Sequence, residues 1–346
     1  MKNKETVCAV VVTYNRKELL IECLDALMKQ TRPLEAIYLI DNFSNDGTAE
    51  LLLENGYLEK LPPENLNASF EIEMDFDNSD LMGIFDDGIE VKEAKIEKTI
   101  KIYYVRMNEN TGGAGGFYEG QKRAYDRGFN WLWLMDDDGF APENCLEVIL
   151  KDAKKNNLKA LNPLVINKED NTKLSFGLDG DMMQTEETIQ KADKNGLIFN
   201  RANPFNGTFL HKDIMAKCGF IKKEMFIWGD ETEYFLRISE NGFEYATTCN
   251  VKYFHPESKT VMQSALFGLL HVPTKPEKLE MNYYRNLGYL NSAYNNTNTI
   301  RTLMKYCLFF ILNRRFSKIK IFLQYYYDGY KNKYLLKNIM ETEWII

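Results

Sequence analysis

A regular alternation of strand-like and helix-like segments in the first half of the chain constrains its fold more than any other feature. Val7–Val12 is a continuous apolar run, as expected of a parallel strand that is buried on both faces. The segment Leu19–Leu27 carries a leucine-rich face, and Asn15 is placed to cap the helix that this face predicts. Ala36–Ile40 is the next strand-like run, and the turn formers of Asp41–Gly47 end it. This alternation indicates an α/β fold with helices that flank a mostly parallel sheet.

The alternation resumes after a long interruption. Lys101–Val105 is the next predicted strand, and a glycine-rich turn precedes a predicted helix near Phe117–Arg127 and a strand at Trp131–Met135. Residues 57–99 are predicted to be an insertion, with twelve acidic residues and four lysines. Within it, Phe70–Phe76 alternates apolar and acidic residues, which predicts an exposed two-sided strand or a hairpin.

The last part of the chain has a helical pattern. Its periodicity predicts helices at Glu277–Asn295, Ile300–Asn313 and Phe316–Lys333. We therefore predict one domain over residues 1–275 and a helical C-terminal region over residues 276–346. A membrane surface or a second copy of the chain, in a homo-oligomer, is the expected contact of that region.

The composition of the chain indicates the cellular compartment in which the protein is expected. The chain has 346 residues and 6 scattered cysteines, and it lacks a Cys-x-x-Cys pair, which disfavours a disulfide framework or a zinc ribbon and suits a reducing compartment. The N-terminus has no signal-peptide pattern. The longest strongly apolar stretch, Cys307–Leu312, is far shorter than the ~20 residues that cross a bilayer. We expect a cytoplasmic protein, soluble or peripheral at the inner face of a membrane.

The net charge of −7 is unevenly distributed. Residues 57–99 have a local net charge of −8, whereas residues 300–340 hold nine Lys or Arg and one acid, a local net of +8. An acidic body disfavours nucleic acid as the main partner. The basic and aromatic C-terminal segment indicates an anionic surface such as lipid headgroups.

Polar and glycine residues follow the predicted strands where ligands bind in open parallel sheets, beyond the carboxyl ends. These positions are Thr13–Asn15, Asp41, Gly112–Gly116 and Asp136–Asp138. Each could be an ordinary turn, but four on one edge predict a nucleotide site. The glycine pattern fits neither the dinucleotide fingerprint nor the Walker loop. It predicts a backbone that approaches another group closely before a helix N-terminus.

The three consecutive aspartates are the strongest single signal. In an extended segment Asp136 and Asp138 would share a face, and Asp137 would point away. Two such carboxylates at a buried strand end favour a divalent ion that bridges to a diphosphate, and a solvated acidic turn is the alternative. His255 is a candidate third ligand, although a lone histidine is more often structural. Mixed carboxylate and imidazole ligation favours Mn²⁺ over Mg²⁺.

A second acidic group opens a helix at Asp230, Glu231 and Glu233. Asp230 and Glu233 have the spacing of a capping box, and acids favour helix N-termini. Glu231 is left over by that account and free to face a cleft, so it is the better candidate for a general base.

Eight short segments, some of them described above, together match the sequence pattern of one enzyme family. They are Val10–Arg16, Leu39–Thr48, Asn110–Phe117, Trp133–Gly139, Phe205–Gly207, Phe226–Tyr234, His255–Pro256 and Tyr284–Tyr289. Together they resemble the inverting glycosyltransferases of family 2, which have the GT-A fold, a Rossmann-like, mostly parallel sheet with flanking helices. Within that family the chain resembles the galactofuranosyltransferases that act on polyprenyl-diphosphate-linked saccharides. Rhamnosyltransferases are close relatives.

The resemblance implies roles for individual residues. The metal would be bound by Asp136, Asp138 and His255, the acceptor hydroxyl would be deprotonated by Glu231 or else Asp230, and Trp228 would line the acceptor cleft. The nucleotide-sugar residues would be Thr13, Asn15, Arg16, Asp41, Arg106, Asn110, Gly112, Gly113, Gly115, Gly116 and Asp137.

The resemblance also implies an activity: metal-dependent transfer of galactofuranose from UDP-galactofuranose, with inversion, to a hydroxyl of a lipid-linked saccharide in cell-surface polysaccharide synthesis. Two alternatives stay open at this point. One is a rhamnosyltransferase that uses dTDP-rhamnose. The other is a nucleotide-sugar-binding module without turnover.

Overall fold

The computed structural model describes residues 5–77, 99–178, 183–258, 261–265, 268, 270–294 and 296–334. The chain forms two compact units that both draw on distant parts of the sequence. The first unit comprises Met1–Thr111, Gly116–Phe220 and Arg237–Ser258, and the second comprises Gly112–Gly115, Ile221–Leu236 and Lys259–Ile346. The predicted assignment of functional domains to residues 1–275 and 276–346 stays a prediction.

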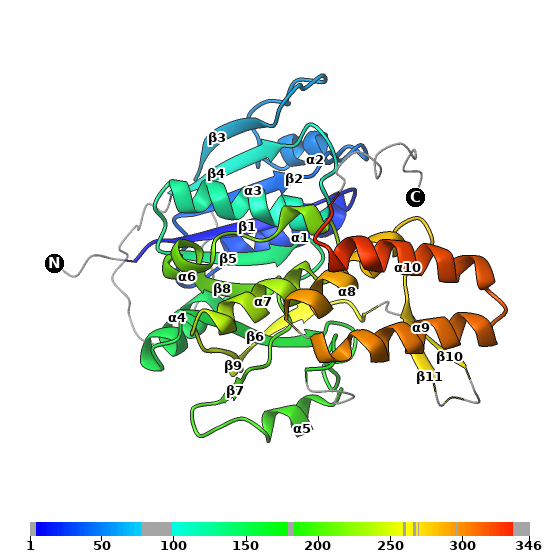
Figure 1. The fold of residues 1–346 in the computed structure, drawn as a ribbon. Helices are drawn as coiled ribbons and strands as arrows, with labels where there is room; N and C mark the ends of the chain where they lie inside the picture. Colours follow the sequence, from blue (N-terminus) through cyan, green and yellow to red (C-terminus); the bar gives the residue numbers. More distant parts are fainter. Residues whose placement is uncertain are drawn as a thin grey trace. The chain divides into compact units, whose positions relative to one another are not determined.

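The first unit is built on a nine-stranded sheet of order β3-β4-β2-β1-β5-β8-β6-β9-β7 (Figure 1). Its strands are β1 (Val7–Thr13), β2 (Ala36–Asp41), β3 (Phe70–Asp77), β4 (Thr99–Arg106), β5 (Trp131–Asp136), β6 (Ala160–Asn167), β7 (Leu197–Phe199), β8 (Asn206–His211) and β9 (Tyr245–His255). Within the described residues, β1, β2, β4, β5, β6 and β9 run in one direction, and β3, β7 and β8 run in the other. The predicted mostly parallel α/β sheet is confirmed.

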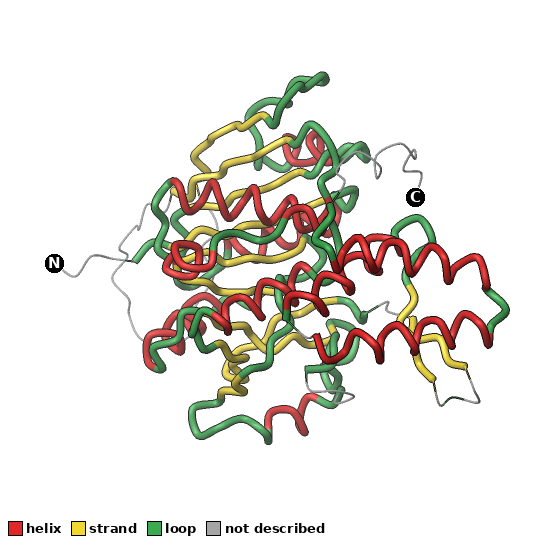
Figure 2. The backbone as a smooth tube through the Cα atoms, viewed as in Figure 1, coloured by secondary structure: helices red, strands yellow, loops and turns green. Residues whose placement is uncertain are grey.

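Helices cover both faces of this sheet (Figure 2). The helices before the C-terminal region are α1 (Lys17–Met28), α2 (Thr48–Glu54), α3 (Gly112–Asp126), α4 (Cys145–Lys155), α5 (Thr185–Ile189), α6 (Lys212–Cys218) and α7 (Asp230–Glu240), with a 3₁₀ turn at Lys223–Met225. Of these, α5 does not lie on a face of the sheet, and most of α7 belongs to the second unit. The alternation of β1 shows why both faces need cover. Val7 and Val11 pack in one core with α1 and α4, whereas Val10 and Val12 face Gly120 and Gly116 of α3.

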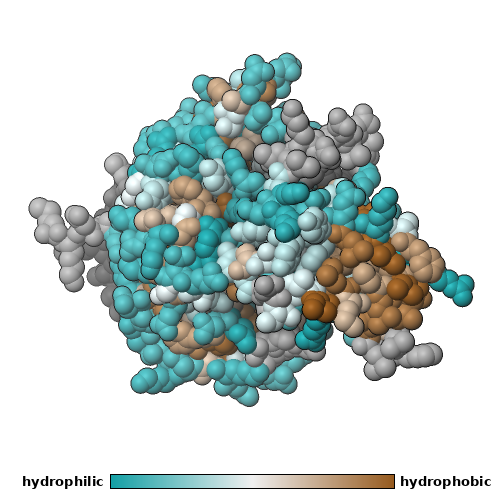
Figure 3. Space-filling view, viewed as in Figure 1, coloured by the Kyte–Doolittle hydropathy of each residue, from teal (hydrophilic) through white to brown (hydrophobic). Residues whose placement is uncertain are grey.

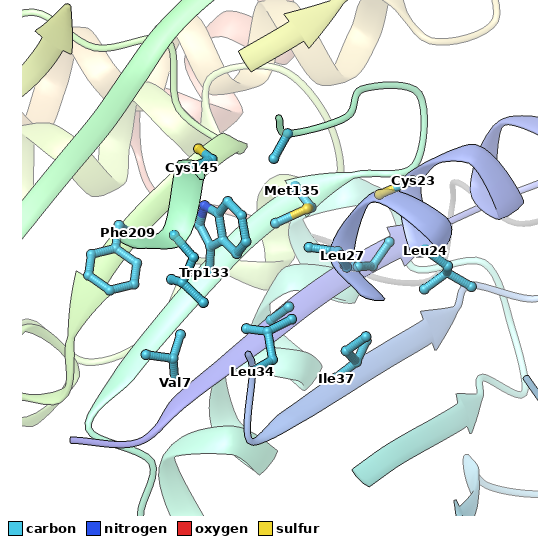
Figure 4. Close-up of a cluster of buried hydrophobic side chains, with 14 of the residues drawn as sticks. Val7, Cys23, Leu24, Leu27, Leu34, Ile37, Trp133, Met135, Cys145 and Phe209 are labelled. Carbon is cyan, nitrogen blue, oxygen red and sulfur yellow. The ribbon is translucent and has the colours of Figure 1, made fainter. Parts of the chain in front are cut away.

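The core beneath α1 and α4 is a continuous apolar layer (Figure 4). Leu24 and Leu27 of α1 lie over the sheet, and Cys145 begins α4 on the same face. Trp133 is fully buried in this layer, and its indole Nε1 donates to the Gly207 carbonyl at 3.0 Å. The core therefore fixes the central strands whose ends carry the predicted site.

The second unit has a helical core of its own. Its elements are the antiparallel pair β10 (Val261–Ala265) and β11 (Leu270–Thr274), helices α8 (Glu280–Ala293), α9 (Thr299–Leu312) and α10 (Phe316–Tyr330), and a 3₁₀ turn at Asn296–Asn298. Buried aromatic rings, among them Phe309 and Phe322, fill the space between the helices. The helices α8, α9 and α10 match the three predicted C-terminal helices to within a few residues. None of the helices in the described part of the chain combines the length and apolarity needed to cross a membrane.

Two sequence predictions require correction. The residue before α1 is Arg16, not Asn15, and the backbone N–H of Lys17 is capped by Asp46 at 3.2 Å. The glycine-rich segment is not a turn before a helix, because Gly112 is the first residue of α3. Asn15 instead accepts a hydrogen bond from Asn45 N, with a left-handed φ of 53°.

The strand predicted inside the acidic insertion is confirmed as β3, which pairs antiparallel with β4 at the sheet edge. It is less exposed than predicted, because Ile72 and Met74 are buried on one face. On its other face Glu71 forms ion pairs with Arg123 and Arg127. Residues 78–98 of the insertion lie outside the described residues.

Candidate active site

The strands that run in the same direction end at one edge of the sheet, and each ends in a polar residue. Thr13 pairs with Asp41, and Asp41 with Arg106, in the register of β1, β2 and β4. Asp136 ends β5 opposite Val12, and His255 ends β9. Residues up to 242 positions apart, Thr13 and His255, are thereby gathered on the edge where ligands bind in such sheets, as the sequence predicts.

Asp41 is the centre of the first group on this edge. Its carboxylate is fully buried and accepts hydrogen bonds from Tyr104 Oη at 2.6 Å, Arg106 Nη1 at 2.7 Å and Ser44 N at 2.8 Å. The Arg106 guanidinium also lies over the ring of Phe43, 5.1 Å from its centroid. Phe43 is 44% exposed and has a left-handed φ of 73°, so it presents an aromatic face beside the buried ion pair. Sequence reasoning missed Phe43, although its place in the turn after β2 could have suggested it.

Asp137 is the centre of the second group. Thr13 Oγ1 donates to its Oδ2 at 2.6 Å, and Arg16 Nη1 donates to its Oδ1 at 3.0 Å and to Asp138 Oδ2 at 2.6 Å. The prediction that Asp137 points away from Asp138 is therefore wrong. The reason is that β5 ends at Asp136, so the strand alternation does not continue through the next two residues. Burial raises the pKa of Asp137 to about 6, although Arg16 opposes that effect.

Asp138 and His255 form a pair on this edge, with Asp138 Oδ1 3.0 Å from His255 Nε2. Burial would raise the pKa of Asp138, but His255 and Arg16 outweigh it and lower the pKa. The pKa of His255 is raised by Asp138 against the opposing effect of burial. Burial and the Asp138 charge together raise the pKa of Asp136 to about 7. Three carboxyl groups, of which Asp137 is buried and Asp136 and Asp138 are half-buried, thus share one arginine and one histidine. Such an arrangement favours added positive charge.

The donor set of this pair fits a divalent ion. His255 Nδ1 lies 2.6 Å from the Pro256 carbonyl oxygen. With Nδ1 held there, Nε2 is the nitrogen that a metal would take, as in histidine ligands whose other nitrogen is held by a carbonyl. Asp138 Oδ1 is buried and accepts no well-directed hydrogen bond. Among the described residues, no group of three or more His, Cys, Asp or Glu side chains is placed to hold a metal ion, so the predicted ligands Asp136, Asp138 and His255 do not form a three-ligand set. Such a site would resemble those in which one or two carboxylates and the substrate phosphates bind the ion.

Close packing explains why glycine occupies some positions of α3, but it does not explain one of them. A Cβ on Gly116 would lie 2.5 Å from Val12 Cγ1, so glycine lets α3 approach β1. Gly112 has a left-handed φ of 69°, and its Cβ would lie 2.1 Å from the Phe226 carbonyl oxygen. A Cβ on Gly113 would meet no atom within 4 Å. Of these three, Gly113 is the glycine whose role packing does not explain. Gly115 also lies within the first turns of α3.

The residues that precede α3 are held to the strand edge. Asn42 Oδ1 accepts from the Thr111 backbone N–H at 3.0 Å and from its hydroxyl at 2.9 Å, and Asn42 Nδ2 donates to Asn110 Oδ1 at 3.2 Å. Asn42 therefore connects the turn after β2 to the two residues that precede α3. It fixes the place of Asn110, which the sequence predicts to be a nucleotide-sugar residue.

The predicted acceptor and base residues belong to the second unit: Trp228 lies in the loop before α7, and Asp230 and Glu231 are the first residues of α7. Phe226, Trp228 and Gly229 have left-handed φ values of 65°, 62° and 97°. For non-glycine residues this conformation costs on the order of 1–3 kcal/mol each and persists only when its surroundings hold it. Asn286 of α8 supplies that support, because its Nδ2 donates to the carbonyls of Met225 at 2.8 Å, Ile227 at 3.1 Å and Trp228 at 2.9 Å.

The helix-capping account of this loop is partly wrong. Glu231, expected to be left over, accepts from the Gly229 backbone N–H at 2.9 Å, a contact at the start of α7. Glu233, expected in a capping box, accepts from Tyr294 Oη at 2.7 Å. Asp230 is buried, whereas Glu231 is partly exposed.

Lys275 and Tyr283 lie beside Trp228 and Glu231. The Lys275 ammonium is 4.7 Å from the Trp228 ring centroid and 5.7 Å from that of Tyr283. Burial lowers the pKa of Lys275, and the charge of Glu231 opposes that effect. The Tyr283 hydroxyl accepts from Tyr306 at 3.3 Å. Neither Lys275 nor Asn286 has a sequence signal of its own, apart from the position of Asn286 in the Tyr-Arg-Asn segment.

The comparison with known families decides the assignment. Residues 8–57 and 84–226 match the family Glycosyl transferase family 2. The chain belongs to glycosyltransferase family 2. The matched range includes the strand ends at Thr13, Asp41, Arg106 and Asp136.

Individual relatives extend this likeness over most of the chain. It is 28% identical over 299 residues to the galactofuranosyltransferase GlfT1 of Mycolicibacterium smegmatis, covering 84% of this chain and 85% of the relative. It is also 28% identical over 320 residues to GlfT1 of Mycobacterium tuberculosis, covering 91% of each protein.

Solved structures support the fold. TarS of S. aureus matches with a TM-score of 0.52 and 11% identity over 84% of this chain, which spans 40% of that larger protein. TarS 1–349 in complex with UDP matches with a TM-score of 0.52 and 10% identity, covering 94% of this chain and 92% of that one. At such identities the likeness shows the fold alone, and the predicted GT-A architecture is confirmed.

Proposed function

We propose that this glycosyltransferase moves galactofuranose from UDP-galactofuranose to a hydroxyl of a polyprenyl-diphosphate-linked saccharide, with inversion at the anomeric carbon. The observation that carries the proposal is the polar edge of the sheet, where Thr13, Asp41, Arg106 and Asp136 end successive parallel strands. The name of the GlfT1 relatives supports galactofuranose as the transferred sugar.

The edge of the sheet suits a nucleotide diphosphate. The UDP complex of a structural neighbour supports a uridine nucleotide as the donor's carrier. Asp41 and Thr13 would bind the nucleoside, and Asp138 and His255, with Asp136 on the same edge of the sheet, would hold a divalent ion, Mn²⁺ before Mg²⁺. When bound, such an ion supplies positive charge to the leaving diphosphate. Arg16 holds Asp137 and Asp138 in place for that task.

Glu231 is the proposed general base. It is partly exposed at the start of α7, next to Trp228, which would line the acceptor cleft. A single displacement requires one base that removes the proton of the attacking hydroxyl. Lys275 would keep Trp228 in position through its contact with the ring.

A lipid-linked acceptor keeps its diphosphate at the membrane surface. We therefore place the enzyme at the cytoplasmic face of a membrane, as a peripheral protein. Residues 300–340 support this location, because they carry a local net charge of +8 and each basic residue near an anionic leaflet is worth about 1 kcal/mol.

The test is a donor screen on a short-chain lipid-diphosphate acceptor. UDP-galactofuranose, UDP-galactopyranose and dTDP-rhamnose are compared, and the product is weighed by mass spectrometry and its anomeric configuration determined by NMR. The expected result is a product of one added hexose from UDP-galactofuranose alone, with inverted configuration. Transfer from dTDP-rhamnose instead would overturn the donor assignment. Failure to release UDP with any acceptor would favour the binding module.

A further inference from the structure

The outer faces of α9 and α10 are apolar, although they belong to surface helices of the second unit. On α9 the exposed residues Ile300, Met304, Leu308 and Ile311 recur every three or four positions and so form one stripe. Ile300 and Met304 are 71% and 67% exposed. A helix at the surface of a protein ordinarily presents charged or polar residues on its outer face. A helix that is apolar on all sides is ordinarily buried.

The helix α10, which forms a helical hairpin with α9, also has an exposed apolar face. Phe316, Leu323 and Tyr327 of α10 are exposed, while Phe322 and Tyr326 of the same helix are buried in the aromatic core. Figure 3 shows this apolar surface as a contiguous hydrophobic area over α9 and α10. We call it the hairpin patch, defined by Ile300, Met304, Leu308, Ile311, Phe316, Leu323 and Tyr327.

Basic side chains border the hairpin patch. Arg301, Arg314, Arg315 and Lys320 are exposed on or between the same helices. Lys318 differs, because it is ion-paired with Glu277 and Glu280. Asp328 is the only acidic residue from 299 to 334. The hairpin patch is therefore apolar, and the charged side chains that border it are basic.

From this combination we infer that the hairpin patch inserts into the interfacial region of an anionic lipid bilayer, with α9 and α10 lying along the surface. Apolar stripes bordered by Lys and Arg are the arrangement that binds acyl chains and anionic headgroups together. A second copy of the chain fits less well, because a symmetric contact would bring the same basic residues of both copies against each other. The choice of a bilayer as partner rests on the proposed lipid-linked acceptor.

Insertion changes the expected dependence on salt. Attachment by charge alone is screened at high ionic strength, because the Debye length falls to about 3 Å at 1 M. Burial of apolar side chains is not screened. Wild-type protein should therefore bind vesicles of phosphatidylcholine with about 30% phosphatidylglycerol at low salt, and keep a substantial part of that binding in about 1 M NaCl.

The experiment is co-sedimentation of the full chain with these vesicles and with phosphatidylcholine alone. Met304→Gln combined with Leu308→Gln should weaken binding at least about tenfold at both salt concentrations. The matched control, Leu61→Gln with Phe199→Gln, changes two exposed apolar residues of the first unit and should bind as wild type. Arg314→Gln with Arg315→Gln should remove most of the preference for anionic vesicles at low salt.

Three results would overturn the inference: no sedimentation of wild type with either vesicle, complete release in high salt, or wild-type binding by the Met304→Gln, Leu308→Gln variant. A lipid-free wild-type dimer that this variant converts to monomer, seen by analytical ultracentrifugation, would assign the patch to self-association instead. Because no donor or acceptor is present, the outcome is independent of the transferase assay. Transfer to a soluble acceptor likewise tests the proposed function without the patch.

Discussion

Asp230 and Glu231 are neighbours in the chain but differ in their surroundings. Asp230 is 4% exposed in the first turn of α7, and Glu231 is partly exposed. Glu231→Gln should therefore lower kcat by roughly 10²–10⁴-fold, the usual contribution of a general base, while the affinity for the donor stays near normal. Asp230→Asn should lower the melting temperature more than Glu231→Gln does. Steady-state kinetics and thermal unfolding of both variants check this. A collapse of kcat in Asp230→Asn alone would reverse the two roles.

The contact of Lys275 with Trp228 predicts how substitution of Lys275 affects acceptor binding. Its ammonium lies over the ring of Trp228, an interaction worth roughly 0.5–2 kcal/mol. Lys275→Met should therefore raise the KM for the acceptor by roughly 2- to 30-fold, with little change in the KM for the donor. Lys275→Arg keeps the cation and should recover most of the loss. An equal rise in both KM values would mean that the residue has a general structural role.

At the scale of elements, α8 determines the shape of the loop before α7. Asn286→Ala removes three hydrogen bonds to a loop with left-handed residues, so the loop should lose its fixed conformation. We expect a loss of kcat of about tenfold or more and a destabilisation of roughly 1–3 kcal/mol.

Asn291→Ala is the matched control for this change. Asn291 is also a buried asparagine of α8, but its Nδ2 donates to Thr302 at 3.1 Å and to Tyr326 at 2.9 Å, away from the loop. The Asn291→Ala variant should be destabilised to a similar extent as Asn286→Ala, with its kcat nearly unchanged. Denaturant unfolding and kinetics of both variants separate the two effects. Equal losses of kcat in both would contradict a specific role for Asn286.

At the scale of the whole molecule, donor-nucleotide binding should appear in the unfolding of the chain. A ligand at about 100 times its Kd stabilises the folded state by about 2.7 kcal/mol. Saturating UDP with Mn²⁺ should therefore raise the melting temperature by several degrees. In EDTA, or in Asp138→Asn, most of that rise should disappear, because Asp138 is one of the residues that would hold the proposed ion, which would supply positive charge to the diphosphate.

Asp170→Asn is the control for this measurement, since Asp170 lies on an exposed turn where it pairs with Lys173. It should keep the full rise with UDP and Mn²⁺. A full rise in EDTA would contradict the proposed metal. Differential scanning fluorimetry measures all of these states without turnover.

Local patterns in the sequence were sufficient for the strands of the first half of the chain and for the three C-terminal helices. The apolar run of β1, the strand endings at Asp41 and Asp136 and the three C-terminal helices all follow from periodicity and turn formers within short windows. The convergence of Thr13, Asp41 and Asp136 also follows, because parallel strands end on one edge. For these features each residue's role depends mainly on its neighbours in the chain.

Only the tertiary structure decided what depends on contacts between distant residues. Strand alternation predicted Asp137 to point away, but Arg16, 121 residues earlier, holds it beside Asp138. Asn286 supports the loop before α7 from 58 to 61 residues away, and its place in the segment Tyr284–Tyr289 does not indicate that contact. The exposure of Met304 on α9 likewise depends on which face packs against the aromatic core, and an apolar helix could have turned either stripe inward. Short-range periodicity therefore determines the elements, whereas the pairing of side chains across elements determines the site and its surfaces.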